Sequence, residues 1–292
     1  MRRGWRAGWL GLAALLGACE GEPAPGPAPS PLVYEVSGPD GAVEGWLFGT
    51  IHALPGGTQW RTPAIQGIIE QADYLVVEIA APGDPAAREA FLALSTSPAL
   101  PPLAERIDPA LRGGLRDLAS AAGTPLEAFT ATETWAAALV LAQAMRSGDP
   151  ANGVDRALIE DFAARRVIEL EGSARQLGIF DRLAPEDQRA LLESVIADHG
   201  DGIDQSDELR AAWLAGDAAR LEEATREGMM EDPELREALL VERNRVWAGR
   251  LREALGEMPR PLVAVGAAHL VGADGLAALL ERQGFAVRRL SP

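Results

Sequence analysis

Segments with the character of β-strands are few in this chain, and most of them lie near its two ends. From about residue 84 to 258 the apolar residues recur mainly at helical spacing. The terminal strands have few other partners, so the two ends of the chain must meet in one sheet. The sequence therefore predicts an α/β fold, with a central mixed β-sheet built from both ends and a largely helical middle segment. The strand-like runs are residues 32–37, 45–50, 74–80, 167–170, 262–266 and 285–290.

Local patterns place turns and helix ends within this outline. Pro39, Asp40 and Gly41 separate the first two strand-like runs and predict a hairpin. Pro185, followed by two acidic residues, is typical of the first turn of a helix. A longer helix is predicted over residues 233–255, where the apolar residues form one stripe.

The N-terminal segment is typical of an exported bacterial lipoprotein. Residues 1–18 carry three arginines and then an apolar run, which is too short for a bilayer that needs about 20 helical residues. The four residues that end at Cys19 resemble the bacterial lipobox, in which cleavage leaves the cysteine as an acylated N-terminus. A plain signal peptide with a chance cysteine is the alternative, but Cys19 is the only cysteine of the chain. Residues 19–31, rich in Pro, Ala and Gly, are expected to form an extended tether.

These segments predict a location and a domain organisation. We expect the protein to be held at the bacterial cell envelope through its N-terminal lipid only. Because Glu20 is not the aspartate associated with inner-membrane retention, the periplasmic side of the outer membrane is favoured. Residues 32–292 contain no second linker and are expected to form a single domain, whose self-association the sequence does not predict.

The charge of the chain excludes one class of partner. It has 43 acidic and 27 basic residues, which gives a formal net charge of −16. A surface this acidic repels phosphate backbones, so nucleic acid is not expected as a partner.

Two histidines occur in the same local setting at opposite ends of the chain. His52 follows a strand-like run that ends near Gly49, and His269 follows one that ends at Gly266. Such glycines allow a tight exit from a strand, and the carboxyl edge of an open α/β sheet is where ligands bind. Each histidine could instead cap a turn, but the repeated setting favours a shared site.

One acidic and one basic residue lie in segments that are otherwise apolar. Glu78 is in the run 74–80, where an unpaired buried carboxylate would be costly, so we expect it to face inward onto a cation, a metal or a proton. Arg243 lies on the apolar stripe of the predicted helix, four residues from Leu239 and four from Trp247. It is expected to point to the core and to pair with Glu78 or with a substrate oxyanion. The alternatives are a strand-end Glu78 in water and an Arg243 that extends past the apolar face to solvent.

Three further polar residues have less distinctive sequence settings. Glu171 follows the run 167–170, and it is either a site residue on the strand-to-helix rim or an ordinary acid in the first turn of a helix. Asp155 is open to the same two interpretations. His199 is expected to be a solvated loop histidine without a role.

Several blocks of the sequence together resemble the TraB/GumN family. They occur in the family's order and extend over about residues 33–290. The blocks are residues 46–55 with Trp60 and Pro63, 72–78, 153–155, Leu170 and Glu171 with Gln176 and Leu177, Ala212 and Trp213 with Gly216 and Asp217, Arg243 and Asn244 with Trp247, and 265–270 with Gly272 and Gly275.

This resemblance implies a fold and a pocket more firmly than a reaction. The family is similar to the Tiki proteases, described as metal-dependent, and more distantly to erythromycin-esterase-like and haem-binding ChaN-like proteins. The paired Gly-x-x-His motifs and the acid of the Tiki proteases would correspond to His52, His269 and Glu78. Two histidines with one or two carboxylates can hold a divalent metal ion such as Zn²⁺, Mn²⁺ or Co²⁺. Other relatives are linked to pheromone shutdown, which is a binding or regulatory role.

Two functions are therefore expected. The first is an envelope-anchored, metal-dependent hydrolase that cuts a peptide or another acyl bond in a peptide or small-molecule substrate. In it, Glu78 is the third metal ligand or the general base, Arg243 orients Glu78 or stabilises the oxyanion, and Glu171 is a further candidate catalytic residue. A metal-free form of this chemistry, with a histidine as general base, stays open. The second function is a non-catalytic protein that binds a peptide or a haem-like ligand in the same pocket.

Overall fold

The structure is a computed structural model. It describes residues 28–81, 83–143, 147–201, 203–256 and 259–291. The predicted signal segment 1–18, Cys19 and most of the tether therefore lie outside the described residues. None of the helices in the described ranges combines the length and the apolar character that crossing a bilayer requires.

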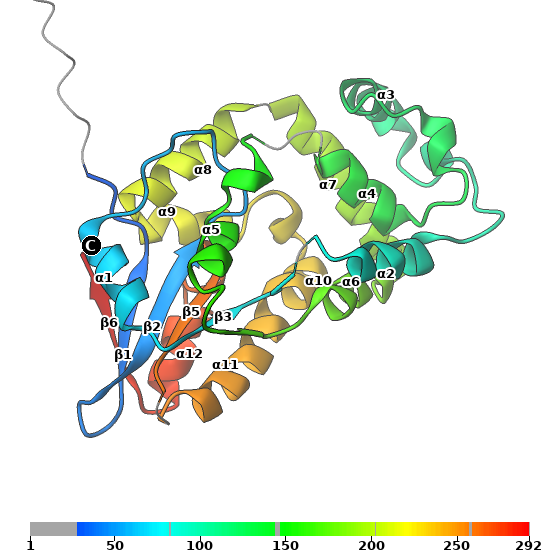
Figure 1. Ribbon diagram of the computed structural model, residues 1–292. Coiled ribbons are helices and arrows are strands. Elements are labelled where there is room, and N and C mark those ends of the chain that lie inside the picture. The colour runs from blue at the N-terminus through cyan, green and yellow to red at the C-terminus, as the bar shows by residue number, and fades with distance from the viewer. Residues whose placement is uncertain (1–27, 82, 144–146, 202, 257–258, 292) are drawn as a thin grey trace, which may run out of the picture.

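A six-stranded mixed sheet forms the centre of the fold, with the strand order β4-β3-β5-β2-β1-β6 (Figure 1). The strands are β1 (Val33–Ser37), β2 (Val43–Thr50), β3 (Tyr74–Val77), β4 (Arg166–Glu169), β5 (Pro261–Gly266) and β6 (Ala286–Leu290). β2, β5, β3 and β4 run parallel to one another, whereas β1 is antiparallel to β2 and to β6. The predicted α/β fold with a central mixed sheet is thus confirmed.

The two ends of the chain meet in this sheet, as the sequence predicts. Val33 of β1 pairs with Leu290 of β6, and Phe48 of β2 pairs with Ala264 of β5. β1 and β2 form the predicted hairpin. Because β5 lies between β2 and β3, the C-terminal part of the chain completes the sheet from within.

Helices account for most of the rest of the described chain. Those that run before β4 are α1 (Pro63–Gln71), α2 (Pro85–Ser95), α3 (Arg112–Ala121), α4 (Thr134–Gln143) and α5 (Val154–Asp161). Those that follow it are α6 (Ser173–Asp181), α7 (Pro185–Asp201), α8 (Ile203–Ala215), α9 (Ala218–Ala224), α10 (Pro233–Arg236), α11 (Glu242–Ala254) and α12 (Leu276–Arg282). Pro185 opens α7, as its sequence context predicts.

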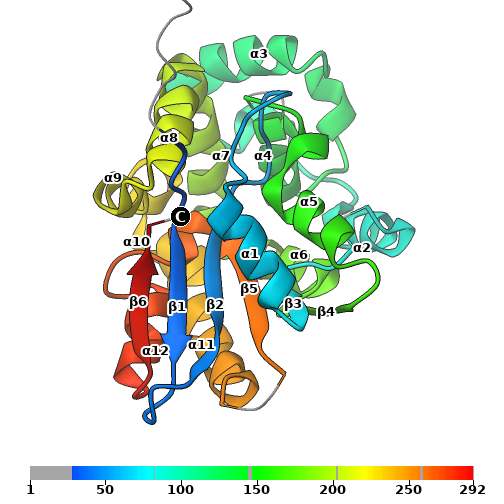
Figure 2. The same cartoon turned by 60° about the vertical axis from the view of Figure 1, so that its left-hand side comes forward.

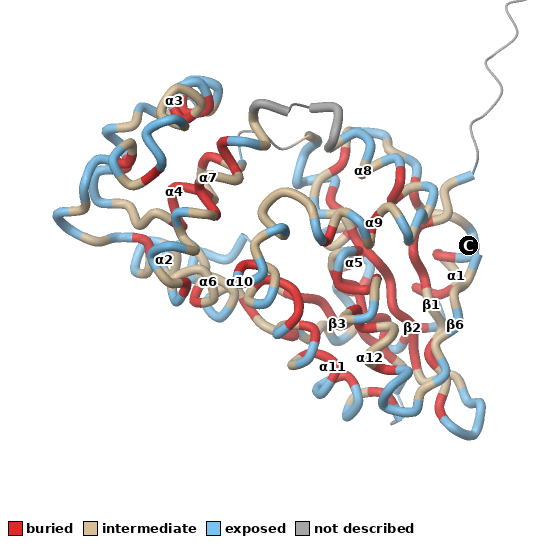
Figure 3. The backbone as a smooth tube through the Cα atoms, turned by 180° about the vertical axis from the view of Figure 1, so that it is seen from behind, coloured by how far each residue is buried: buried red, intermediate tan, exposed pale blue. Residues whose placement is uncertain are grey.

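The buried apolar side chains of the described residues form two clusters. One surrounds the sheet, with α1 and α5 on one face and α11 and α12 on the other (Figures 1 and 2). The other lies among α2, α3, α4, α6, α7 and α10, which we call the helical lobe. Figure 3 shows the buried residues concentrated in the strands and on the inner sides of α4 and α7.

One nearly continuous helix joins the two clusters and corresponds to the predicted helix 233–255. It consists of α10, a π-helical turn (Glu237–Val241) and α11. Leu239 in the π-helical turn packs in the core of the helical lobe, whereas Trp247 in α11 packs in the core around the sheet. Arg243 therefore lies where the two cores adjoin. Such π-helical turns are rare and are frequently found at functional sites.

Two local predictions are wrong. The third strand ends at Val77, so Glu78 is the first residue beyond β3. The main-chain oxygen of Glu78 accepts from the N–H groups of Glu171 and Gly172, which lie in the loop after β4. These loop contacts replace the regular pairing that would continue the strand. His199 lies in α7 and is partly buried, not in a solvated loop. The apolar face of α7, with Leu192 in the core of the helical lobe, favours continuation of that helix.

Candidate functional site

The candidate site lies at the carboxyl edge of the four parallel strands, the edge at which open α/β sheets bind ligands. Each of these strands is followed within three residues by a predicted site residue. The four are His52 after β2, Glu78 after β3, Glu171 after β4 and His269 after β5. Helix α5 adds Asp155 in its first turn, and α11 adds Arg243 and Asn244 near its start. The structure thus brings the predicted residues to one edge of the sheet.

Glu78 is buried, and both oxygens of its carboxylate accept hydrogen bonds. Oε1 accepts from the main-chain N–H of Gly266 at 2.8 Å, and Oε2 accepts from Nη2 of Arg243 at 2.8 Å. Burial raises the pKa of the Glu78 carboxyl, but the nearby positive charges and the Gly266 N–H outweigh it and lower the pKa to about 2. Glu78 therefore faces inward onto a cation, which is one of the three partners expected from its sequence setting.

Arg243 points into the molecule, and its side chain is only 11% exposed. Nε and Nη2 donate to Glu171, and Nη2 also donates to Glu78. Nη1 donates to the main-chain oxygen of Leu239 at 3.0 Å and lies 3.2 Å from Nε2 of His269. All five N–H groups of the guanidinium therefore have acceptors. This favours the role of orienting Glu78 over that of binding an oxyanion.

Glu171 is the second carboxylate on Arg243. Its side chain is 2% exposed, and its Oε2 accepts from Arg243 Nη2 at 2.8 Å and from Nε at 3.1 Å. It lies between β4 and α6, on the predicted strand-to-helix rim. Arg243 therefore bridges the carboxylates of Glu171 and Glu78.

His269 is buried in the short turn that follows β5. Its Nδ1 lies 2.6 Å from Oδ1 of Asn244, and its ring packs on Trp247 with 4.6 Å between the ring centroids. Oε1 of Glu78 is 4.0 Å from its Nε2. Burial lowers the pKa of the His269 imidazole to about 4 and outweighs the opposing charge of Glu78. His269 is therefore neutral near pH 7.

His52 differs from His269 in exposure, because 63% of its side chain is accessible to solvent. Its Nδ1 lies 2.7 Å from Oδ2 of Asp155, whose Oδ1 accepts from the hydroxyl of Thr50 at 2.6 Å. The start of α5 is pressed against the backbone of His52. A Cβ on Gly153 would lie 2.4 Å from the carbonyl oxygen of His52, so glycine permits this close approach. Asp155 therefore lies in the first turn of α5 and also contacts His52, so the structure combines its two interpretations.

The functional groups of the site surround the position that a Cβ atom on Gly266 would take. A Cβ atom built there would lie 3.4 Å from Oε1 of Glu78, 3.7 Å from Nε2 of His52 and 3.7 Å from Cδ2 of His269. Two imidazoles encoded at opposite ends of the chain and one buried acid thus converge on a common point. The absence of a side chain at Gly266 leaves room for an atom between them.

Two features of the site are also found around divalent metal ions. Asp155 and Asn244 each bond the Nδ1 atom of one histidine, an outer-shell arrangement typical of metal-binding histidines. The site also holds three carboxylates against one guanidinium, so its net charge is negative. Among the described residues, however, no group of three or more His, Cys, Asp and Glu side chains is arranged to hold a metal. His269 Nε2 has one lone pair, which could bind an ion only in exchange for its contact with Arg243.

Two polar positions of this site are not predicted from the sequence as site residues. Thr50 is the last residue of β2, where a hydroxyl gives no indication of a partner 105 positions away. Asn244 lies on the buried face of α11, which it shares with Trp247 and Leu251. An amide on an otherwise apolar helix face, beside Arg243 in a block that resembles the family, is the indication of its role.

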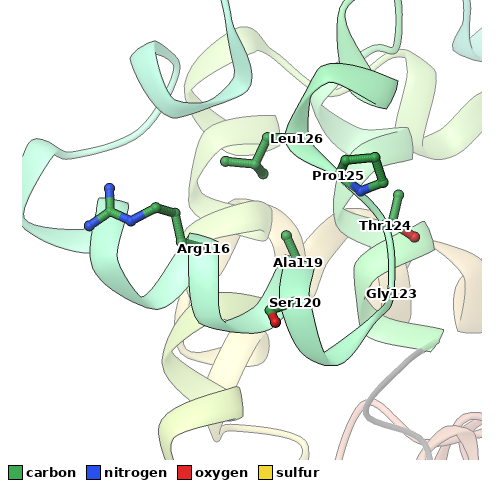
Figure 4. A pocket seen from close by; sticks show the side chains of 7 residues that line it. All are labelled: Arg116, Ala119, Ser120, Gly123, Thr124, Pro125 and Leu126. Atoms are coloured by element: carbon green, nitrogen blue, oxygen red, sulfur yellow. The ribbon is translucent and has the colours of Figure 1, made fainter.

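A hollow of 390 Å³ lies in the helical lobe, at α3 and the segment that follows it (Figure 4). Its lining residues are Arg116, Ala119, Ser120, Gly123, Thr124, Pro125 and Leu126. The lining includes neither a histidine nor a carboxylate, so it offers no acid–base chemistry comparable with that at the edge of the sheet.

Comparison with known proteins places the whole site within one family model. The model of the TraB/PrgY/gumN family matches residues 32–289. No curated protein and no solved structure matches the chain.

Proposed function

The chain belongs to the TraB/PrgY/gumN family, and on this premise we propose that it is a hydrolase of peptide or other acyl bonds. It works with a divalent metal ion, and a lipid on Cys19 holds it at the bacterial cell envelope on the periplasmic side. Family membership alone does not specify a reaction. The geometry of the site is therefore the main support for this proposal.

One observation carries the proposal. Oε1 of Glu78 lies 3.4 Å and Nε2 of His52 3.7 Å from the position that a Cβ on Gly266 would take, and Cδ2 of His269, the ring carbon next to Nε2, lies 3.7 Å from it. Two imidazoles and a carboxylate around one small space are the ligand set of many catalytic metal sites, which use three protein ligands and keep a further position for water or substrate.

His52, His269 and Glu78 would hold the ion, and Zn²⁺, Mn²⁺ and Co²⁺ all accept this set of ligands. When bound, such an ion supplies Lewis-acid activation of a water molecule and of the scissile carbonyl. A hydrolase needs both effects, because water is a poor nucleophile at neutral pH and an acyl carbonyl is a modest electrophile.

The side chains around these three residues prepare them for that role. Asp155 holds the Nδ1 proton of His52, so that in the neutral imidazole Nε2 carries the lone pair. Arg243 binds Oε2 of Glu78, while Oε1 accepts from the Gly266 N–H and lies 4.0 Å from Nε2 of His269. The low pKa of Glu78 keeps this carboxylate ionised, as a ligand must be.

The test is turnover by the purified mature chain on a panel of peptides and esters, before and after removal and return of Zn²⁺, Mn²⁺ or Co²⁺. The variants are His52→Asn and His269→Asn, and the matched control is His199→Asn, since His199 lies in α7 of the helical lobe. We expect the wild type and the control to cleave a substrate when metal is present and to lose this activity when metal is removed. The variants His52→Asn and His269→Asn should not cleave it in either condition.

Other outcomes would overturn parts of this proposal. Cleavage that persists without metal but is lost in His52→Asn would exclude the metal and assign the general base to His52 with Asp155. No cleavage of any substrate, with saturable ligand binding that His269→Asn abolishes, would instead support the non-catalytic binding protein.

A further inference from the structure

Asn244 is a fully buried polar residue with both ends of its side chain bonded. Its exposed fraction is 0%, and it lies on the face of α11 that also buries Trp247 and Leu251. A buried amide in such a place is costly unless its hydrogen bonds are made. The two bonds it makes determine how His269 is held.

The orientation of the Asn244 amide follows from its partners. Nδ2 donates to the main-chain oxygen of Asp274 at 2.9 Å, and a carbonyl oxygen can only accept. Oδ1 is therefore the atom that faces Nδ1 of His269 at 2.6 Å. Because Oδ1 has no hydrogen to donate, Nδ1 of His269 must carry the proton.

The other side of the His269 ring leads independently to the same tautomer. Nη1 of Arg243 lies 3.2 Å from Nε2, and a guanidinium nitrogen can only donate. Nε2 must therefore be the nitrogen with the lone pair. The donor on one side and the acceptor on the other allow one neutral form of the ring.

The two histidines of the site are held by chemically different partners. His52 is exposed and is bonded to a carboxylate, that of Asp155, which would also stabilise the charged imidazolium. His269 is buried and is bonded to a neutral amide, which accepts from Nδ1 without adding negative charge. An amide therefore fixes the ring without favouring its protonation.

We propose that Asn244 is a positioning residue, which holds His269 as the neutral Nδ1–H tautomer with its Nε2 lone pair facing Arg243 and Glu78. The consequence for metal binding rests on the proposed function, whereas the tautomer does not. This role requires a hydrogen-bond acceptor at position 244. A side chain of similar size without an acceptor would not hold the Nδ1 proton.

The chain has three histidines, so ¹H–¹⁵N spectra of the imidazole nitrogens can resolve each one at neutral pH. The metal-free wild type is expected to show His269 with a protonated Nδ1 and an unprotonated Nε2. Asn244→Leu keeps much of the volume but removes the acceptor. The Nδ1 proton and nitrogen signals of His269 are therefore expected to lose the shifts of a hydrogen-bonded N–H, although Arg243 still donates to Nε2. Asn244→Asp keeps an acceptor for Nδ1 but loses the donor to the main-chain oxygen of Asp274, so it is expected to retain a protonated Nδ1 at a loss of stability. The control, Asn152→Leu, should leave the His269 signals unchanged.

A second readout measures the consequence for binding. Asn244→Leu is expected to weaken the affinity for Zn²⁺ by about 10- to 100-fold, whereas the control Asn152→Leu should leave this affinity unchanged. A protonated Nε2 in the wild type would overturn the proposal, even if Asn244→Leu did not fold. Wild-type shifts in a folded Asn244→Leu protein would overturn it as well. The spectra need neither metal nor substrate. They can therefore test the tautomer even if the protein proves not to be a metal-dependent hydrolase.

Discussion

Nη2 of Arg243 donates to Oε2 of Glu78 at 2.8 Å and joins residues that are 165 positions apart in the chain. The same nitrogen donates to Oε2 of Glu171, also at 2.8 Å. All three side chains are buried or nearly so. One guanidinium thus compensates two buried carboxylates where the core of the sheet adjoins that of the helical lobe.

Replacement of Arg243 by Met should therefore destabilise the protein strongly. Two carboxylates would be left buried without a cation, and the loss of one partner of a buried ion pair typically costs about 3–5 kcal/mol of the free energy of unfolding. Urea denaturation at pH 7 measures this loss. Adding Glu78→Gln to the Arg243→Met protein should recover part of it, because one uncompensated charge is removed.

The matched control for this prediction is Arg245→Met on the same helix. The side chain of Arg245 is 53% exposed and pairs with Glu237 and Glu242 at the surface. Such pairs contribute about 0–1 kcal/mol, so the control should change stability little. Equal small losses in the two variants would contradict the buried-pair interpretation.

The stability of the protein should fall as the pH drops from 6.5 to 4. The pKa of His269 is about 4 in the folded protein and 6.5 ordinarily, so within this range the unfolded chain binds a proton that the folded one does not. The contribution of His269 is fully present above pH 6.5 and amounts to about 3 kcal/mol, at 1.36 kcal/mol for each pH unit of the shift. Glu78, with a pKa of about 2, should add a second loss below pH 4.5.

Comparison of the wild type with two variants isolates the contribution of His269. His269→Gln should flatten the dependence of the free energy of unfolding on pH between 6.5 and 4, whereas His199→Gln should leave it unchanged. The reverse pattern, or a wild type whose stability is constant over this range, would count against a buried neutral His269.

Gly266→Ala should separate binding from stability. The backbone of Gly266 has φ −49°, which alanine can adopt, and the new methyl group would meet its neighbours at 3.4–3.7 Å. The free energy of unfolding should therefore change by no more than about 1 kcal/mol. The methyl group would fill the space between the two histidines and Glu78, so the affinity for Zn²⁺ should fall at least about tenfold.

Gly153→Ala is the contrasting control, because its methyl group would lie 2.4 Å from the carbonyl oxygen of His52 and should destabilise the fold. Unchanged Zn²⁺ affinity in Gly266→Ala, measured by calorimetry, would show that the ion does not enter this space.

Cys19→Ser should release the protein from the membrane fraction of bacterial cells. The predicted acyl chains contribute about 0.8 kcal/mol of membrane affinity for each buried CH₂ group, and the variant has no thiol to receive them. Fractionation followed by mass measurement of the mature chain tests this prediction. A wild-type chain without an added lipid mass would refute the predicted anchor.

Most strands and helices of the fold could be predicted from the sequence, because their patterns are formed by neighbouring residues. The strand-like run at 262–266 and the helical stripe of 233–255 are read from neighbouring residues, and both recur as β5 and α11 with its preceding turns. The meeting of the chain ends followed from the shortage of other strands. The π-helical turn (Glu237–Val241) could not be predicted. Its hydrogen bonds span one residue more than those of an α-helix, and no distinctive sequence pattern marks such a turn.

The candidate site could be predicted only in part from the sequence. His52, Glu78 and His269 are indicated by the strands that precede them, and Arg243 by its place on an apolar stripe. Their polar partners depend on tertiary contacts instead. Asp155 meets His52 only because α5 begins against that loop, and Asn244 meets His269 only because α11 packs behind β5.

The metal content of the purified mature chain tests the central claim most directly. After equilibration with Zn²⁺, Mn²⁺ or Co²⁺ and removal of unbound ions, elemental analysis should find about one ion per wild-type chain. The double variant His52→Ala/His269→Ala should retain none, and His199→Ala should bind as the wild type does. A wild type that takes up none of the three ions, or a double variant that still holds one, would contradict the account.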